Sequence, residues 1–181
     1  MAKNIKSLGL DLSLVGSGLV ILKNGKLEKQ KLIKSKPILN GKPIDEVGRI
    51  RKIVEEIESI ISDELPSIAV IEGLAFMVRN ATALVQLSAL NYMTRAMLVD
   101  YHVPFVIVAP TSLKKFITGS GVAKKDVMLI ETYKRYGVSI LNDNECDAYG
   151  LAQVGLALLG GNSKTTTKLQ EEVLMLLKKQ L

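Results

Sequence analysis

Acidic residues stand at three places in this sequence where a carboxylate could do chemistry. Asp11 lies inside an apolar run, Glu72 closes another, and Asp147 follows the polar cluster Asp143-Asn144-Glu145 at the start of a helical pattern. Carboxylates gathered around one point repel each other unless cations sit between them. Oxygen ligands of this kind suit Mg²⁺ or Mn²⁺. If the fold brings these acids together, the pattern therefore predicts a divalent metal site.

Such a site has a well-defined chemistry. Two divalent ions roughly 3.5 to 4 Å apart can activate a water and stabilise the leaving oxygen of a phosphodiester. Each acid also has a simpler explanation. Asp11 could cap the turn at 14–18, and Glu72 could be an ordinary polar strand end. Asp147 could be an anion stabilised by the dipole at a helix N-terminus. Taken jointly, the three acids favour hydrolysis of a nucleic-acid backbone.

The first acid depends on a strand at the start of the chain. Alternation places Asp11 on one strand face with Gly9 and Ser13, and leucines 8, 10 and 12 on the other face. An ionised Asp in a central strand is costly to bury without a compensating partner. We therefore expect Asp11 to have one.

The other elements follow from turn signals and periodicity. Asn24-Gly25 predicts a hairpin between strands 18–23 and 26–34. An amphipathic helix at 43–62 then crosses over to strand 67–72, which should lie parallel to the first strand. The later elements are expected to be helix 81–100, strand 103–108, a short helix at 110–116, a glycine loop at 118–122, and helices 123–136, 144–159 and 167–181. The fold class is α/β, a mixed sheet with a three-strand antiparallel meander plus parallel strands, covered by helices.

Composition limits the class of protein. The 181 residues suit a single domain, 1–181, and the net charge of +6 suits a polyanionic partner. The one cysteine, Cys146, excludes an intrachain disulfide and thiolate zinc clusters. We see no secretion signal and no apolar run of about 18 residues, so we expect a cytoplasmic protein with no membrane partner.

Several motifs together resemble a known family. They are Gly9-Leu10-Asp11 before a meander, Ile71-Glu72 before a loop, the segment 110–121, and the run from Asn144 to Ala152. In this order they resemble the RuvC-type Holliday junction resolvases, most closely their phage-borne branch. The resemblance implies an RNase H-like fold, a homodimer, a bacterial or phage-infected host cell, and a role in DNA recombination and repair. It also implies Mg²⁺-dependent cutting of four-way DNA junctions, with two ions per site and Mn²⁺ as a substitute.

The resemblance also implies roles for the acids. Asp11, Glu72 and Asp147 match three of the family's four catalytic, metal-binding acids. The fourth usually precedes the last by three residues, where this chain has Asn144. Either Asn144 ligates through its amide oxygen, or Asp143, four residues before Asp147, takes over.

A basic segment is the candidate DNA-binding surface. Lys114 and Lys125 match basic family positions, and Lys125 is similar to the family's active-site lysine. Six basic residues face two acidic ones between Lys114 and Arg135, an excess that phosphate contacts would require. Phe76 sits where similar proteins carry an aromatic thought to unstack bases. The other predicted DNA contacts are Arg79, Lys115, Gly119, Gly121 and Lys124. The alternatives are a solvated helix face, a plain glycine turn and a buried loop-closing Phe.

The helix at 81–100 is apolar most of the way round, which indicates cover on two sides. One side should face the sheet and the other a second subunit, which would place two sites on one junction. Two alternative functions remain: an RNase H-like nuclease acting on other branched DNA or RNA–DNA hybrids, and a junction-binding protein that does not cleave.

Overall fold

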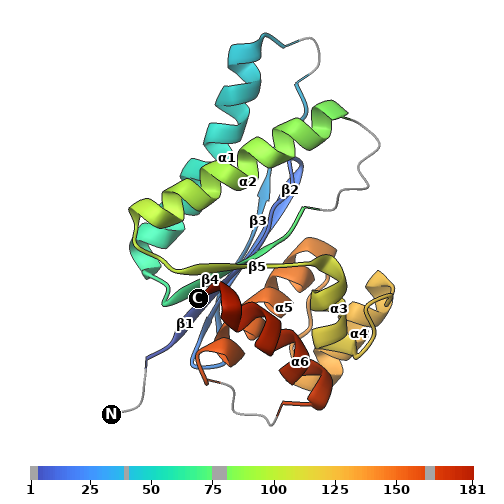
Figure 1. The fold of residues 1–181 in the computed structure, drawn as a ribbon. Coiled ribbons are helices and arrows are strands. Elements are labelled where there is room, and N and C mark those ends of the chain that lie inside the picture. Colours follow the sequence, from blue (N-terminus) through green and yellow to red (C-terminus); the bar gives the residue numbers. More distant parts are fainter. Residues whose placement is uncertain (1–3, 39–40, 75–80, 162–165) are drawn as a thin grey trace.

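The computed structural model describes residues 4–38, 41–74, 81–161 and 166–181 and contains one five-stranded sheet (Figure 1). The strands are β1 Lys6–Asp11, β2 Gly16–Lys23, β3 Lys26–Lys34, β4 Ile68–Glu72 and β5 Phe105–Val108, in the order β3-β2-β1-β4-β5. The first three form an antiparallel meander, while β4 is parallel to β1 and β5 to β4. The predicted mixed sheet is confirmed.

Six α-helices occur in the described residues, close to the predicted segments. They are α1 Pro43–Glu64, α2 Ala81–Asp100, α3 Pro110–Thr118, α4 Lys125–Tyr136, α5 Asp143–Leu158 and α6 Lys168–Leu177, followed by a 3₁₀ turn, Lys178–Gln180. The helices predicted at 123–136 and 167–181 were too long, because Lys124 is the extended N-cap of α4 and the last α-helix ends at Leu177. None of the described helices is both long and apolar enough to cross a membrane.

The sheet separates two hydrophobic cores. Helices α1 and α2 cover one face, and α3 to α6 lie on the other (Figure 1). Leu8 and Leu10 of β1 pack into the α1–α2 core, as the alternation predicted. Gly9 faces α5 so closely that an added Cβ would lie 1.9 Å from the carbonyl oxygen of Ala148. Helix α5 therefore rests directly on β1, which fixes where its first turn lies.

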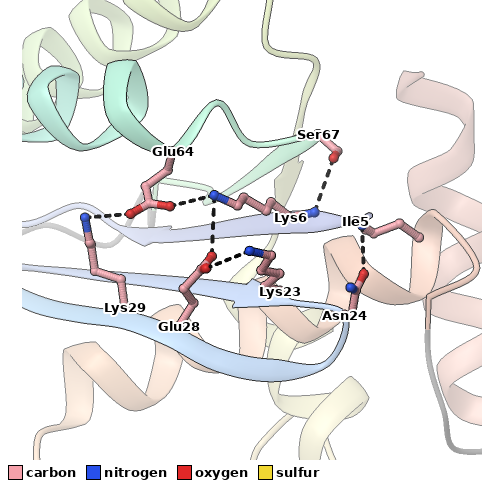
Figure 2. A network of polar contacts seen from close by, with 8 residues as sticks. All are labelled: Ile5, Lys6, Lys23, Asn24, Glu28, Lys29, Glu64 and Ser67. Carbon is pink, nitrogen blue, oxygen red and sulfur yellow. Dashed lines mark hydrogen bonds and ion pairs between the residues drawn. The ribbon is translucent and has the colours of Figure 1, made fainter. Parts of the chain in front are cut away.

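An ion-pair network ties α1 to the start of the sheet (Figure 2). The Glu64 carboxylate accepts from Lys6 at 2.8 Å and pairs with Lys29 at 2.7 Å, and Glu28 joins Lys6 to Lys23. Hydrogen bonds from the two lysines lower the pKa of Glu64 to about 2. Because Lys6 begins β1 and Asp11 ends it, this network anchors the edge of the sheet opposite to the acids.

Candidate active site

Asp11 and Glu72 end two adjacent parallel strands. The register pairs Leu10 with Ile71, so the next residue on each strand reaches the same edge of the sheet. Asp11 is only 9% exposed, and its carboxyl shares a hydrogen bond with that of Glu72. Burial raises the pKa of Asp11 to about 6, against the lowering effects of that bond and of Lys125. Burial, followed by the charges of Asp11 and Asp147, raises the pKa of Glu72 to about 8.

Asp147 reaches the same edge from helix α5. Burial, followed by the charge of Asp11 and more weakly that of Asp143, raises its pKa to about 7, against the lowering effects of Lys125 and Lys114. The structure thus brings together the three acids that the sequence singled out. Their catalytic role stays a prediction that rests on this arrangement.

The start of α5 is positioned by Gly9 of β1, by Gly18 of β2 and by the helix N-cap. Asn142 is the N-cap, and its side-chain oxygen accepts from the backbone N–H groups of Asn144 and Glu145. A Cβ on Gly18 would lie 2.0 Å from the carbonyl oxygen of Asn144, so α5 also contacts β2 directly. Asp143 is the first residue of the helix.

The two candidates for the fourth ligand point to different partners. The side-chain nitrogen of Asn144 donates to the carbonyl of Gly16 at 2.6 Å, which ties this amide to β2. Asp143 instead pairs with Lys125 at 3.1 Å and raises the pKa of Asp147 by its charge. Of these two candidates, Asp143 is therefore the one whose charge acts on Asp147.

Adjacent lysines on α3 have different surroundings. The charge of Lys114 lowers the pKa values of both Glu72 and Asp147, so Lys114 lies near the acids. Lys115 pairs with Glu172 of α6 at 2.7 Å and is locally neutralised. Of the two, Lys114 is the better placed for a phosphate at this edge.

The predicted basic segment also includes the loop between α3 and α4. Lys124 and Lys125 are exposed, and the Lys125 charge reaches Asp11 and Asp147. Gly119 is the left-handed C-cap of α3, with φ 81°, and a Cβ on Gly121 would lie 3.1 Å from the carbonyl oxygen of Thr111. Both glycines thus have a structural reason to be glycine. Phe76 and Arg79 lie outside the described residues.

The donor set fits a hard divalent cation in its chemistry. Its members are carboxyl oxygens, and their raised pKa values reflect buried negative charge that the protein leaves largely uncompensated. As the side chains stand, no group of three acidic, histidine or cysteine residues in the described part of the chain is arranged to hold a metal ion. To hold a cation, Asp11 and Glu72 would have to give up the proton between them and move closer to Asp147.

Sequence reasoning missed a positioning residue, Arg49 of α1. Its guanidinium donates to the carbonyl of Leu14, three residues beyond Asp11, and to the hydroxyl of Ser35 at 2.8 Å. Arg49 thus fixes the turn after β1 against the end of β3. The only available signal was an arginine beside the apolar stripe of this helix, directly before the buried Ile50.

Comparisons with known proteins show which family and fold the chain is similar to. The sequence model of a family described as "Crossover junction endodeoxyribonuclease RuvC" matches residues 7–133. This range includes Asp11, Glu72, Lys114 and Lys125 but ends before Asp147.

Proteins of that same name are similar over most of their length. One from Carboxydothermus hydrogenoformans is 28% identical over 161 residues, which is 87% of this chain and 99% of the relative. One from Prochlorococcus marinus is 30% identical over 154 residues, which is 82% of this chain and 96% of the relative.

Solved structures show the same fold. A Thermus thermophilus RuvC in complex with a Holliday junction substrate superposes with a TM-score of 0.72 at 17% identity, covering 87% of this chain and 97% of that one. A Fowlpox virus resolvase with Holliday junction DNA gives a TM-score of 0.50 at 12% identity, covering 86% of this chain and 99% of that one. The expected RNase H-like architecture is confirmed.

Proposed function

The chain belongs to the RuvC family of crossover junction endodeoxyribonucleases, and we propose that it resolves four-way DNA junctions by hydrolysing backbone phosphodiesters. The observation that carries this proposal is the meeting of Asp11, Glu72 and Asp147 at one edge of the sheet. The lysines near these acids, Lys114 and Lys125, supply the positive charge that a DNA phosphate needs to approach them.

The family is one of metal-dependent nucleases, and we propose Mg²⁺ as the metal, with two ions per site and Mn²⁺ as a substitute. Asp11, Glu72 and Asp147 would hold the ions, together with either Asp143 or the amide oxygen of Asn144. When bound, such ions activate a water and stabilise the leaving oxygen of a phosphodiester.

The chain's own residues prepare the site for this chemistry. Two central strands and a helix that rests on them hold the acids, so their positions depend on backbone packing rather than on loops. Burial keeps their surroundings poor in water, which strengthens their interaction with any cation. The ion pair with Asp143 holds the Lys125 ammonium beside the acids, where it can contact a phosphate next to the cut.

We also propose a homodimer that forms through α2. Val85, Tyr92 and Val99 are exposed at 67%, 64% and 61%, and their spacing of seven residues places them on one side of the helix. Beside them, Asn91 Oδ1 and Arg95 Nε are buried and have no hydrogen-bond partner among the described residues. A second copy packed on this stripe would cover the apolar side chains and place two active sites on one junction.

The dimer can be tested by changing the centre of that stripe. Tyr92→Asp should convert a dimer to a monomer in sedimentation equilibrium, because a charge would be buried in the interface. Met175→Asp is the matched control, since Met175 is similarly exposed on α6. A monomeric wild-type protein, or a Tyr92→Asp protein that still dimerises with unchanged affinity, would argue against this interface.

The cleavage test compares four substrates in Mg²⁺. A synthetic four-way junction, a plain duplex, a flap and an RNA–DNA hybrid are each incubated with wild type and with Asp11→Asn. We expect paired, symmetrical nicks in the junction alone, and a loss of at least about a hundredfold in the variant, because one ligand to the ions changes from an anion to a neutral amide.

Other outcomes of that test separate the alternatives. Tight junction binding without nicks in Mg²⁺ or Mn²⁺ would indicate a binding protein that does not cleave. Cutting of the flap or the hybrid in place of the junction would keep the chemistry and change the substrate. An Asp11→Asn protein that cuts at the wild-type rate would remove Asp11 from the mechanism.

A further inference from the structure

A pocket of about 470 Å³ opens between the end of β3 and the N-terminal half of α1. It lies apart from the acids and from the basic segment on α3 and α4, and none of the site residues predicted above lines it. The side chains that line it include Lys34, Lys36, Arg49 and Lys52. The pocket is therefore basic.

The charges in this pocket are not balanced from within. Lys34, Lys36 and Lys52 are exposed, and none forms an ion pair with any residue that the structure describes. Of the two acids in the lining, Glu56 pairs with Lys31 at 3.0 Å, and Asp45 accepts from the backbone N–H of Lys42 at 2.8 Å but keeps its charge, so the four basic side chains outnumber the acids. The three lysines thus present positive charge that an external anion could neutralise.

Gly48 is an unusual residue in the lining of this pocket. It lies inside α1, where glycine destabilises a helix by roughly 0.5–1 kcal/mol relative to alanine. No atom of the described chain lies within 4 Å of the position that its Cβ would occupy, so internal packing does not require glycine here. Without a side chain, the helix backbone is open to close approach by a ligand.

The pocket lies at the same sheet edge as the acids. β3 runs in the same direction as β1, so Lys34 and Asp11 both end their strands there, with β2 between them. Two strand spacings separate β1 from β3 by about 10 Å. Lys114 belongs to α3, on the opposite face of the sheet from α1. Positive charge thus flanks the acids on both sides.

We propose that the β3–α1 pocket is a second phosphate-binding site, which holds the backbone of a DNA strand on the side of the acids away from α3 and α4. The proposal rests on the proposed function, because it takes a DNA strand across the acidic edge as given. Arg49 is tied to Leu14 and Ser35 and so acts as a fixed wall, while the three lysines make the phosphate contacts.

The test measures junction binding as a function of salt, without divalent cations. Lys34→Gln, Lys36→Gln and Lys52→Gln are each compared with Lys26→Gln, which removes one exposed charge at the hairpin turn on the opposite edge of the sheet. Each pocket variant should weaken binding a few-fold and reduce the slope of log K against log salt by about 0.9, the value for one lost phosphate contact. The Lys26→Gln slope should equal that of the wild type.

A second variant tests whether the unobstructed backbone at Gly48 is part of the binding site. Gly48→Glu places a carboxylate where nothing obstructs it, so the fold should persist while junction affinity falls at least as far as in a lysine variant. Circular dichroism and thermal unfolding verify that the variants are folded.

The outcomes separate this inference from the function on which it rests. If the wild type binds and cuts the junction but the pocket variants keep its salt slope and affinity, the second phosphate site is wrong and the resolvase function stands. If the wild type does not bind the junction at all, both proposals fall.

Discussion

The carboxyl groups of Asp11 and Glu72 are hydrogen-bonded to each other where β1 and β4 end side by side. Two carboxylates within hydrogen-bonding distance of each other cannot both be charged at low cost, so one proton remains between them. Asp147 adds a third negative charge from α5. In the absence of a cation, the folded chain therefore keeps protons that its unfolded form would release.

This arrangement predicts that the metal-free protein loses stability as the pH rises. The folded pKa values of Asp11, Glu72 and Asp147 are about 6, 8 and 7, against ordinary values of 3.8, 4.5 and 3.8. Between about pH 4 and 8 the folded state binds more protons than the unfolded state, so the free energy of unfolding falls with rising pH. We expect a decrease of several kcal/mol from pH 5 to pH 8, measured by urea unfolding in a chelator.

A variant and a metal titration check the source of that decrease. Glu72→Gln cannot ionise, so its stability should depend less on pH above pH 6. Added Mg²⁺ should stabilise the wild type more at pH 8 than at pH 5, because protons compete for the same oxygens at low pH. A wild-type stability that rises from pH 5 to pH 8 in chelator would contradict the assignment.

Asn144 is predicted to be held by β2 through its amide nitrogen. Asn144→Asp would exchange a donor for a carboxylate directly against the carbonyl of Gly16, so we expect a loss of about 1–3 kcal/mol in the metal-free protein. Urea unfolding in chelator measures it. Asn144→Ala, which removes the bond without adding a charge, should lose only about 1 kcal/mol. Equal stability of the Asp variant and the wild type would show that this hydrogen bond does not hold α5 on β2.

The neighbours Lys114 and Lys115 provide a matched pair. Lys114→Ala removes a charge that acts on Glu72 and Asp147, so junction binding should weaken several-fold and its salt slope should fall by about 0.9. Lys115→Ala breaks an ion pair with Glu172 and should change stability by at most about 1 kcal/mol, with a near wild-type slope. Binding isotherms at four salt concentrations distinguish the two, and equal slopes would contradict the different surroundings described above.

Sequence reasoning predicted those features that depend on local chemistry. The Asn24-Gly25 turn occurs as expected, and α1 and α6 begin at local signals in the sequence, which are Pro43 at the first position of α1 and the capping box of Thr167 and Gln170. The meeting of Asp11 with Glu72 followed from one topological rule, that a helical crossover makes the second strand parallel to the first.

The remaining features depend on helix phase, which the sequence does not reveal. Whether Asp143 or Asn144 points to Asp147 depends on how α5 is rotated over β2, and the decisive contact joins residues 128 positions apart. The same holds for Lys114 and Lys115, which are adjacent in sequence but have different partners because α6 packs against α3. The β3–α1 pocket likewise exists only once the end of β3 lies against α1.

The contact between β1 and α5 yields a prediction about Gly9. An added Cβ would lie 1.9 Å from the carbonyl oxygen of Ala148 and 2.5 Å from the backbone nitrogen of Ala152, so Gly9→Ala must push α5 off the sheet. We expect a loss of about 3 kcal/mol or more in the free energy of unfolding, since backbone atoms on both sides cannot yield without moving an element. Gly48→Ala is the matched control, because its methyl group meets nothing within 4 Å and should stabilise the helix by about 0.5–1 kcal/mol. Urea unfolding of both variants measures the two effects. Because α5 carries Asp147, any Gly9→Ala protein that still folds should also have lost the part of the pH dependence of its stability that Asp147 contributes. An unchanged stability and an unchanged pH dependence would show that α5 does not rest on β1.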